Sequence, residues 1–268
     1  MEKLKYILIE FTKAVSKIHL LGTISDEIFA NFPANLPQIV KDSWREKTKK
    51  IIFAGDPKET MKLDFKDYGF LGSLIHVLPS EGKETDFQQV ILRQDLINYL
   101  AHLEAVMQDI QRFIFTNKPE LLPEEKEVKW KEISDKKSVT EILDFIINKQ
   151  LEKSGYDKLT YQIERLNNKP FLFKISIKKK ELEKLDLLIA IRNLILHNGN
   201  RISNDYLTLN PTSSFKVGEQ LVLTRDEINE AHVLIQRVAY ESYASVGNIL
   251  FGIAKETLYN EMSYNPER

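Results

Sequence analysis

Apolar residues recur at helical spacing in several long stretches of the chain. Residues 3–21 place an apolar side chain every three or four positions, which predicts an amphipathic helix that Gly22 ends. Residues 85–117 repeat this pattern, from the capping box Thr85-Asp86-Phe87-Gln88 to the stop signal Asn117-Lys118-Pro119. At ~1.5 Å per residue this second helix spans roughly 48 Å, a length typical of the spine of a bundle.

The C-terminal half of the chain carries further helix signals. Capping boxes at residues 138–141 and 224–227 open helices that reach to about residue 151 and beyond residue 250. Another helix is indicated from about residue 157, and residues 180–197 form a strong helical run closed by Asn198-Gly199. Residues 171–177 are compatible with strand or loop. Residues 205–223, with Asn210-Pro211 and Val217-Gly218, predict a short extended or hairpin-like connection.

The stretch between the first two long helices is rich in structure breakers. It predicts a helix over residues 39–53, then a loop over residues 55–82 with a short strand at residues 61–65. We place the domain boundary at the end of this loop. Residues 1–82 then form an N-terminal helical extension, which either enlarges the core or regulates the rest, and residues 83–260 form an all-α helical domain.

Composition narrows the class of protein. The chain has 268 residues, of which 43% are hydrophobic, enough for a packed core. It has no cysteine, which suits a reducing compartment, and no apolar run of the ~18 residues that a membrane span needs. The net charge of -1 lacks the basic excess of a protein that coats nucleic acid. We therefore expect a soluble, cytoplasmic protein without membrane association.

The helix over residues 180–197 carries the candidate chemistry. Apolar residues occupy nearly its whole circumference, which predicts a buried helix. Asp186, Asn193 and His197 form one polar stripe within about 40°. Arg192 points instead into an apolar row, where burial is costly unless the guanidinium meets an anion or a polar cleft. Structural alternatives are that Asp186 pairs with an arginine elsewhere and that His197 bonds a carbonyl at the helix end.

Arg192-Asn193-Leu194-Ile195-Leu196-His197 resembles the R-x(4-6)-H motif of the HEPN superfamily, in the version in which Asn follows the Arg. The following His197-Asn198-Gly199, then Val217-Gly218 and residues 221–224, are similar to the RiboL-PSP-HEPN type. Residues 96–122 resemble the first core helix of that type. The resemblance covers residues 85–255 and leaves residues 1–80 outside.

The resemblance implies a HEPN-like bundle of long antiparallel helices that forms a homodimer, so that Arg192 and His197 of two protomers share a cleft. Many HEPN proteins are endoribonucleases that need no metal or other cofactor, and they occur in toxin-antitoxin modules, phage defence and RNA-guided CRISPR effectors. An antitoxin or a defence-system protein is then a possible partner. Other members are inactive and bind RNA or mediate dimerisation.

Elementary chemistry fits a ribonuclease, because the 2′-hydroxyl of RNA supplies the nucleophile and cleavage then leaves a 2′,3′-cyclic phosphate. His197 is suited to proton transfer, Arg192 to holding the scissile phosphate, and Asn193 to orienting either of them. Basic residues around this helix are candidates for RNA contact, against the simpler interpretation of a solvated lysine face: Lys178, Lys179, Lys180, Lys184 and Arg201.

Other interpretations remain open or are disfavoured. A catalytically inactive HEPN protein that binds RNA or a partner is the main alternative, since Asp186 could pair with Arg192 or His197 and repel phosphate. A toxin group in which a tyrosine two residues after the His is modified is disfavoured, because Gly199 stands there. The other histidines, His19, His76, His102 and His232, are isolated in the sequence and predict structural roles and no metal site.

Overall fold

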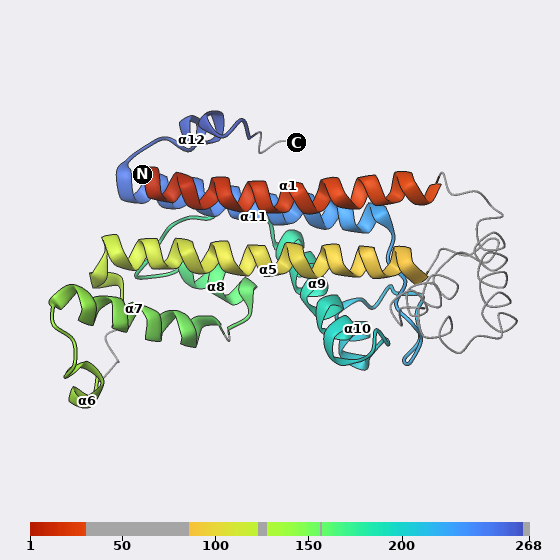
Figure 1. Ribbon diagram of the computed structural model, residues 1–268, viewed down its shortest axis with the longest axis horizontal. Coiled ribbons are helices and arrows are strands. Elements are labelled where there is room, and N and C mark those ends of the chain that lie inside the picture. The colour runs from red at the N-terminus through yellow and green to blue at the C-terminus, as the bar shows by residue number, and fades with distance from the viewer. Residues whose placement is uncertain (31–85, 123–127, 156, 265–268) are drawn as a thin grey trace, which may run out of the picture. The chain divides into compact units, whose positions relative to one another are not determined.

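The computed structural model describes residues 1–30, 86–122, 128–155 and 157–264, and these residues form helices joined by loops (Figure 1). No β-strand occurs among them, which confirms the all-α prediction. The α-helices are α1 Glu2–Ala30, α5 Asp86–Asn117, α6 Trp130–Ile133, α7 Val139–Gly155, α8 Leu159–Asn167, α9 Lys179–His197, α10 Asn204–Leu209, α11 Arg225–Phe251 and α12 Lys255–Glu261. A 3-10 turn, Pro119–Leu121, follows α5.

The chain divides into two compact units. One consists of Met1–His19 and Asp95–Arg268, and the other of Leu20–Gln94. The expected boundary between residues 82 and 83 lies outside the described residues, as do the predicted helix at 39–53 and the loop and strand at 55–82. Residues 1–19, which we assigned to an extension, belong to the larger unit.

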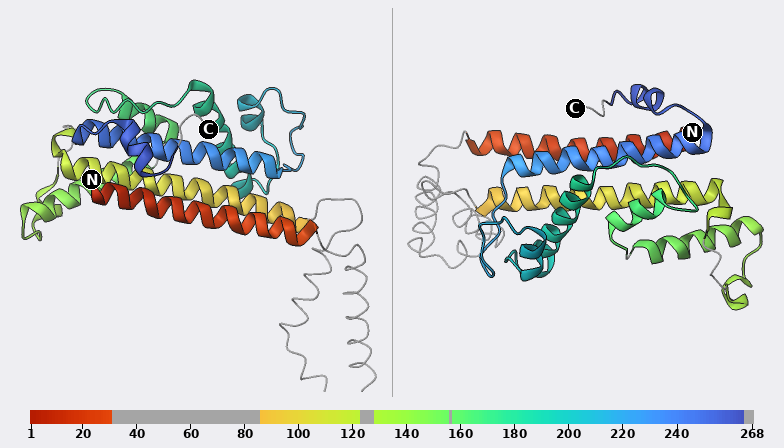
Figure 2. Two further views of the ribbon diagram at one scale, coloured as in Figure 1. Left: turned by 90° about the horizontal axis from the view of Figure 1, so that it is seen from above. Right: turned by 180° about the vertical axis from the view of Figure 1, so that it is seen from behind.

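Three long helices form the centre of the larger unit. In all three views α1 runs antiparallel to α5 and α11 (Figures 1 and 2). Each buries an apolar stripe, as expected for helices of a bundle. The fully buried residues include Leu4, Leu8 and Val15 of α1, Leu100, Leu103 and Met107 of α5, and Ile235, Val238 and Val246 of α11. Burying this apolar surface is the main term that holds the three helices together.

Two histidines that are far apart in the sequence meet between these helices. The rings of His19 on α1 and His232 on α11 are stacked, with centroids 4.4 Å apart, and Tyr99 of α5 lies 5.2 Å from His232. Burial and the neighbouring His19 lower the pKa of His232 to about 4. The predicted structural role agrees with this packing for His19 and His232, which are isolated in the sequence but adjacent in the fold, whereas His76 lies outside the described residues.

Helix boundaries follow the sequence signals in most places. The capping box of α11 forms as expected, with Glu227 N–H donating to Thr224 Oγ1 (3.2 Å) and Thr224 N–H to Glu227 Oε2 (2.7 Å). Ser138 Oγ accepts from Glu141 N–H (3.2 Å) at the start of α7, but that helix continues to Gly155 rather than ending near residue 151.

Three predictions of local structure need correction or refinement. Gly22 does not end the first helix, since α1 continues to Ala30, and a glycine inside a helix costs only about 1 kcal/mol. Residues 171–177 form a loop in which Phe171, Phe173 and Ile175 are buried. The connection at 205–223 is not extended throughout, because it begins inside α10, and its Gln220 forms an isolated antiparallel bridge with Arg201, which precedes α10.

No described helix combines the length and the apolar composition needed to cross a lipid bilayer.

Candidate functional site

Helix α9 holds the candidate catalytic residues, and local signals fix both of its ends. At its start, Lys178 N–H donates to Glu181 Oε2 (2.8 Å), which satisfies a backbone donor that the first turn leaves free. At its end, Gly199 adopts a left-handed φ of 56° and Asn200 N–H donates to Leu194 O (3.0 Å). This cap ends α9 at His197, so the imidazole stands at the helix terminus.

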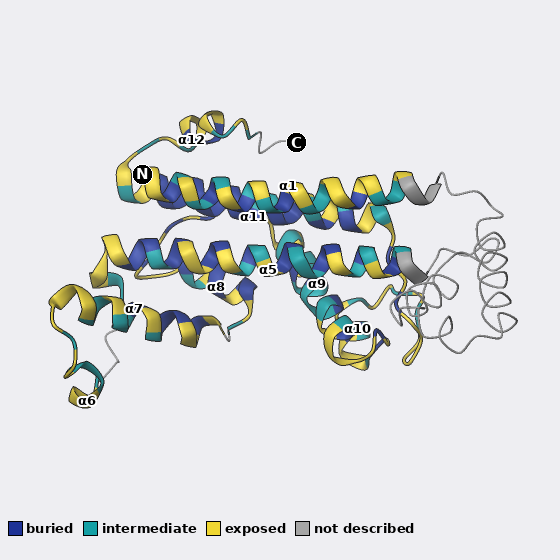
Figure 3. Cartoon of the chain, in the orientation of Figure 1, coloured by how far each residue is buried: buried dark blue, intermediate teal, exposed yellow. Residues whose placement is uncertain are grey.

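The prediction that α9 is buried on all sides is wrong. Only four of its residues are buried, Leu185, Leu188, Ile191 and Leu194, while Leu196 is 52% exposed. The helix contacts α8, α10 and α11, and other parts of its surface remain open (Figure 3). A nearly apolar circumference indicates burial only where neighbouring elements cover every side of a helix.

Arg192 meets the anion that its apolar surroundings require. Its Nη1 lies 2.5 Å from Glu104 Oε1 of α5, in an ion pair whose side chains are 19% and 40% exposed respectively. Its Nη2 donates a longer hydrogen bond to Asn193 Oδ1, at 3.4 Å. Nε is buried and finds no acceptor among the described residues. The requirement for an anion is confirmed, and the anion is Glu104.

Sequence analysis missed Glu104, although its position carries a weak signal. It adjoins Leu103 and lies three residues before Met107, both fully buried on α5, so a carboxylate here stands at the edge of an apolar stripe. Such a charge usually has a partner or reaches solvent. The sequence does not identify this partner, because Arg192 is 88 residues away.

Asn193 and Asp186 face a common cleft, as expected from their place on one stripe. The cleft has a volume of about 360 Å³ and is lined mainly by residues of α9 and α10, together with Lys158. Asp186 Oδ1 accepts a hydrogen bond from Thr160 Oγ1 of α8 (2.9 Å). Within the part of the chain that the structure describes, Asp186 thus has a hydroxyl as its hydrogen-bond partner and forms no ion pair with an arginine, which was the structural alternative.

His197 is exposed at the last turn of α9. Among the described residues its imidazole forms no hydrogen bond with a backbone carbonyl, which was the structural alternative for this residue. It does not line the cleft that Asn193 and Asp186 share. The three candidate residues thus occupy the same end of α9, with an exposed imidazole, a half-buried guanidinium and an amide in contact with that guanidinium.

The candidate RNA-binding residues differ in whether their basic groups already form ion pairs or hydrogen bonds within the protein. Lys178, Lys179 and Lys180 are exposed around the start of α9, and Lys179 lies 3.9 Å from Glu183. Lys184 forms an ion pair with Glu230 of α11. Arg201 donates from Nη1 to Gly218 O (3.0 Å) across the hairpin-like connection. Lys178 and Lys180 therefore carry the charge most accessible to a phosphate.

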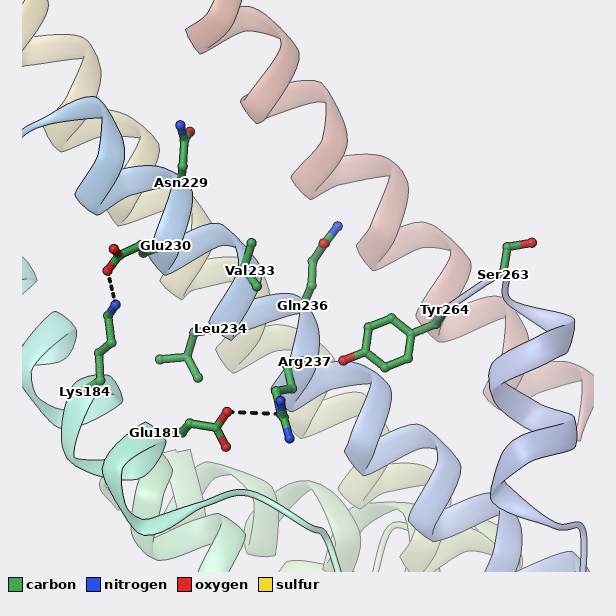
Figure 4. Close-up of a pocket in the computed structure, with 10 residues that line it drawn as sticks. All are labelled: Glu181, Lys184, Asn229, Glu230, Val233, Leu234, Gln236, Arg237, Ser263 and Tyr264. Carbon is green, nitrogen blue, oxygen red and sulfur yellow. Dashed lines mark hydrogen bonds and ion pairs between the residues drawn. The ribbon is translucent and has the colours of Figure 1, made fainter. Parts of the chain in front are cut away.

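A larger cleft, of about 660 Å³, lies where α9, α11 and the C-terminal segment meet (Figure 4). Two ion pairs connect its helices, Lys184 with Glu230 and Glu181 with Arg237 at 3.2 Å. Tyr264 closes one end, and burial raises its pKa to about 12. No sequence signal indicated this cleft, in which two acidic and two basic side chains form ion pairs with one another.

No group of three or more histidine or acidic side chains in the described ranges is arranged to hold a metal ion. Comparison with known proteins adds no assignment: no protein-family model, no curated protein and no solved structure matches the chain. The HEPN resemblance therefore rests on the residues of the sequence, and the function that it implies is a proposal.

Proposed function

We propose that the protein is a metal-independent endoribonuclease of HEPN type, acting in a phage-defence or toxin-like stress system and leaving a 2′,3′-cyclic phosphate. The observation that carries the proposal is the exposure of His197 at the same end of α9 as Arg192. An imidazole open to solvent can exchange a proton with RNA near neutral pH. Arg192, five residues earlier on the same helix, is the source of the positive charge that the phosphorane needs.

Each residue has a distinct role in this proposal. His197 exchanges a proton with the 2′-hydroxyl or with the leaving oxygen. Arg192 holds the nonbridging oxygens of the scissile phosphate, for which a planar cation with several N–H donors is suited. Asn193, whose Oδ1 accepts from Arg192 Nη2 at 3.4 Å, orients the guanidinium. The exposed Lys178 and Lys180 attract the RNA backbone toward this helix.

The test is incubation of the purified full chain with total RNA in EDTA. We expect the wild type to cut RNA and to leave cyclic phosphate ends, and the variants His197→Ala and Arg192→Ala to lose this activity at least a hundredfold, the lower range for a general acid or base. His102→Ala, at a half-buried histidine of α5, is the matched control and retains activity. Activity retained in both site variants refutes the proposal.

A second candidate function, an inactive protein that binds RNA or a partner, is favoured by the Glu104–Arg192 ion pair. A carboxylate that already occupies the guanidinium competes with a phosphate and reduces the charge that would stabilise a transition state. This candidate predicts that the wild type binds RNA or a partner protein and cuts no RNA in EDTA or in Mg²⁺.

A further inference from the structure

The cleft beside Asn193 has the composition of a small ligand site. Its volume, about 360 Å³, falls within the range of pockets that hold small organic groups. Ile189, Ala190 and Leu194 of α9 form one wall, and Tyr206 and Leu209 of α10 form the other. Apolar walls with polar groups at the edge suit a flat aromatic ring, which can pack its faces on side chains while its edge forms hydrogen bonds.

Existing hydrogen bonds determine which polar atoms remain for a ligand. Asp186 Oδ1 accepts from Thr160, which leaves a second acceptor site on Oδ1 and both sites on Oδ2. Asn198 uses Nδ2 to donate to Arg201 O (2.6 Å), which leaves its Oδ1. Asn193 uses Oδ1 to accept from Arg192, which leaves its Nδ2 as a donor. With Asp205, the cleft offers two carboxylates to the donors of a ligand, while Asn193 Nδ2, the Lys158 ammonium and the Ser203 hydroxyl can donate to its acceptors.

This pattern is complementary to one nucleobase edge in particular. Guanine presents two neighbouring donors, N1–H and the 2-amino group, beside one acceptor, O6. A carboxylate can accept from both donors at once, and an amide N–H2 or an ammonium can donate to O6. Uracil, by contrast, has a single donor between two acceptors, so it would leave carboxylates facing carbonyl oxygens.

The charge of the cleft indicates which part of a nucleotide it can hold. Asp186 and Asp205 carry two negative charges in the cleft against one positive charge on Lys158, so the cleft disfavours a phosphate. Arg192 follows a different face of α9 toward Glu104, and Asn193 contacts both the cleft and Arg192. A nucleotide can therefore place its base in the cleft and its phosphate toward Arg192.

We propose that this cleft is a subsite for a guanine base next to the cleaved phosphate, with Asp186 as the residue that selects guanine. The inference rests on the proposed function only in taking the base to belong to an RNA substrate. Base recognition itself requires neither cleavage nor a second protomer, so it can be tested separately.

The experiment measures binding of free guanosine, inosine and uridine to the full chain by NMR titration. Inosine differs from guanosine only in lacking the 2-amino group. We expect guanosine to bind about tenfold more tightly than inosine, and uridine more weakly still, since an unpaired acceptor discriminates strongly against a ligand that lacks the donor. Equal affinities for guanosine and inosine overturn the proposal.

Matched variants assign the effect to this cleft. Asp186→Asn keeps an oxygen that accepts from Thr160 and removes the charge, and we expect it to weaken guanosine binding about tenfold and inosine binding less, because inosine donates only N1–H to this side chain. Asp205→Asn is a second variant with an expected effect of the same sign. Asp144→Asn, at an exposed aspartate of α7, is the control and keeps wild-type affinity. Guanosine affinity unchanged in both cleft variants overturns the proposal.

The two proposals fail in different ways. Selective guanosine binding without RNA cleavage supports the base subsite and refutes the nuclease. RNA cleavage that depends on His197, combined with equal binding of all nucleosides, supports the nuclease and refutes the subsite.

Discussion

Arg192 already binds an anion when no RNA is present, and this affects what a phosphate must do to reach it. Glu104 lies 2.5 Å from Nη1, on a helix that packs in the core of the larger unit. The pair is partly exposed, so its net contribution to stability is at most about 1 kcal/mol. An incoming phosphate therefore faces a competitor that it can displace at modest cost.

The first prediction concerns removal of this competitor. Glu104→Gln keeps the size of the side chain and a hydrogen-bond acceptor for Arg192 but removes the charge. We expect RNA to bind about fivefold more tightly, the factor that ~1 kcal/mol represents. The measurement is fluorescence anisotropy with a labelled RNA on a His197→Ala background, which prevents cleavage.

Glu164→Gln, at an exposed glutamate of α8, changes the net charge by the same amount at another place and is the control. We expect it to change RNA affinity less than twofold, since an exposed charge outside the site is screened by salt. Equal gains in the two variants would mean that net charge, and not Glu104, limits binding.

The second prediction concerns His232, whose folded-state pKa of about 4 lies below its ordinary value of 6.5. As pH falls through 6.5 the unfolded chain takes up a proton at this residue and the folded chain does not, so the free energy of unfolding decreases until about pH 4. His232→Phe retains a ring beside His19 and Tyr99 and removes the proton site.

Urea unfolding at pH 7 and pH 4.5 measures this effect for both proteins. We expect the wild type to lose about 2 kcal/mol more than His232→Phe over this interval, somewhat less than the full pKa shift gives at 1.36 kcal/mol per unit. Titrating groups that do not contact His232 are common to both proteins and cancel in the difference. If the wild type and His232→Phe lost the same free energy of unfolding between pH 7 and pH 4.5, His232 would not be held neutral in the folded state.

At the scale of the element, the sequence predicted where helices begin and end better than it predicted which residues pack against them. The capping box of Thr224 and Glu227 forms, and Asn198-Gly199 ends α9, because caps depend on neighbours within a few residues. The burial of α9 and the partner of Arg192 depend on which helices pack beside it. That information is distributed over distant parts of the chain, such as Glu104, and periodicity does not contain it.

The same distinction applies to short elements and to the candidate site. Helix α10, with six residues, has a Ser203 side chain that accepts from Tyr206 N–H (3.3 Å), yet the nearby Asn210-Pro211 made a loop the natural prediction. The stripe of Asp186 and Asn193 was predictable because both positions follow from helical geometry. The hydrogen bond of Asp186 to Thr160 was not, since it joins two helices.

The third prediction tests the cap that places His197 at the helix end. Gly199 has a φ of 56°, and a Cβ built there meets no atom within 4 Å. Gly199→Ala therefore adds backbone strain without a clash, and we expect it to lower the free energy of unfolding by about 1 kcal/mol. Gly199→Asn should lose roughly half as much, because asparagine tolerates the left-handed region.

Thermal and urea unfolding measure these losses. Gly155→Ala is the control, since Gly155 is the last residue of α7 and its φ is not left-handed. An added Cβ there would lie 3.1 Å from Nε2 of Gln108, the flexible end of a side chain that can move. We expect stability near that of the wild type. If Gly155→Ala lowered the free energy of unfolding as much as Gly199→Ala, the left-handed φ of Gly199 would not be the cause of the destabilisation.

For the whole molecule, the number of proton-transferring groups bears on the oligomeric state. Cleavage by 2′-hydroxyl attack uses one group to remove a proton and another to supply one. The end of α9 provides a single exposed imidazole in each chain, and His19 and His232 lie between the long helices instead. Two copies related by a two-fold axis bring two such imidazoles to one cleft, so the proposed chemistry is most economical in a homodimer.

The fourth prediction follows from this stoichiometry. If two chains form each active site, the cleavage rate per chain falls on dilution below the dissociation constant of the dimer, and in the dilute limit becomes proportional to protein concentration. Sedimentation velocity at the same concentrations gives the fraction of dimer, and we expect the two curves to have the same midpoint. A cleavage rate per chain that stays constant while the dimer dissociates would instead assign both proton transfers to groups of one chain.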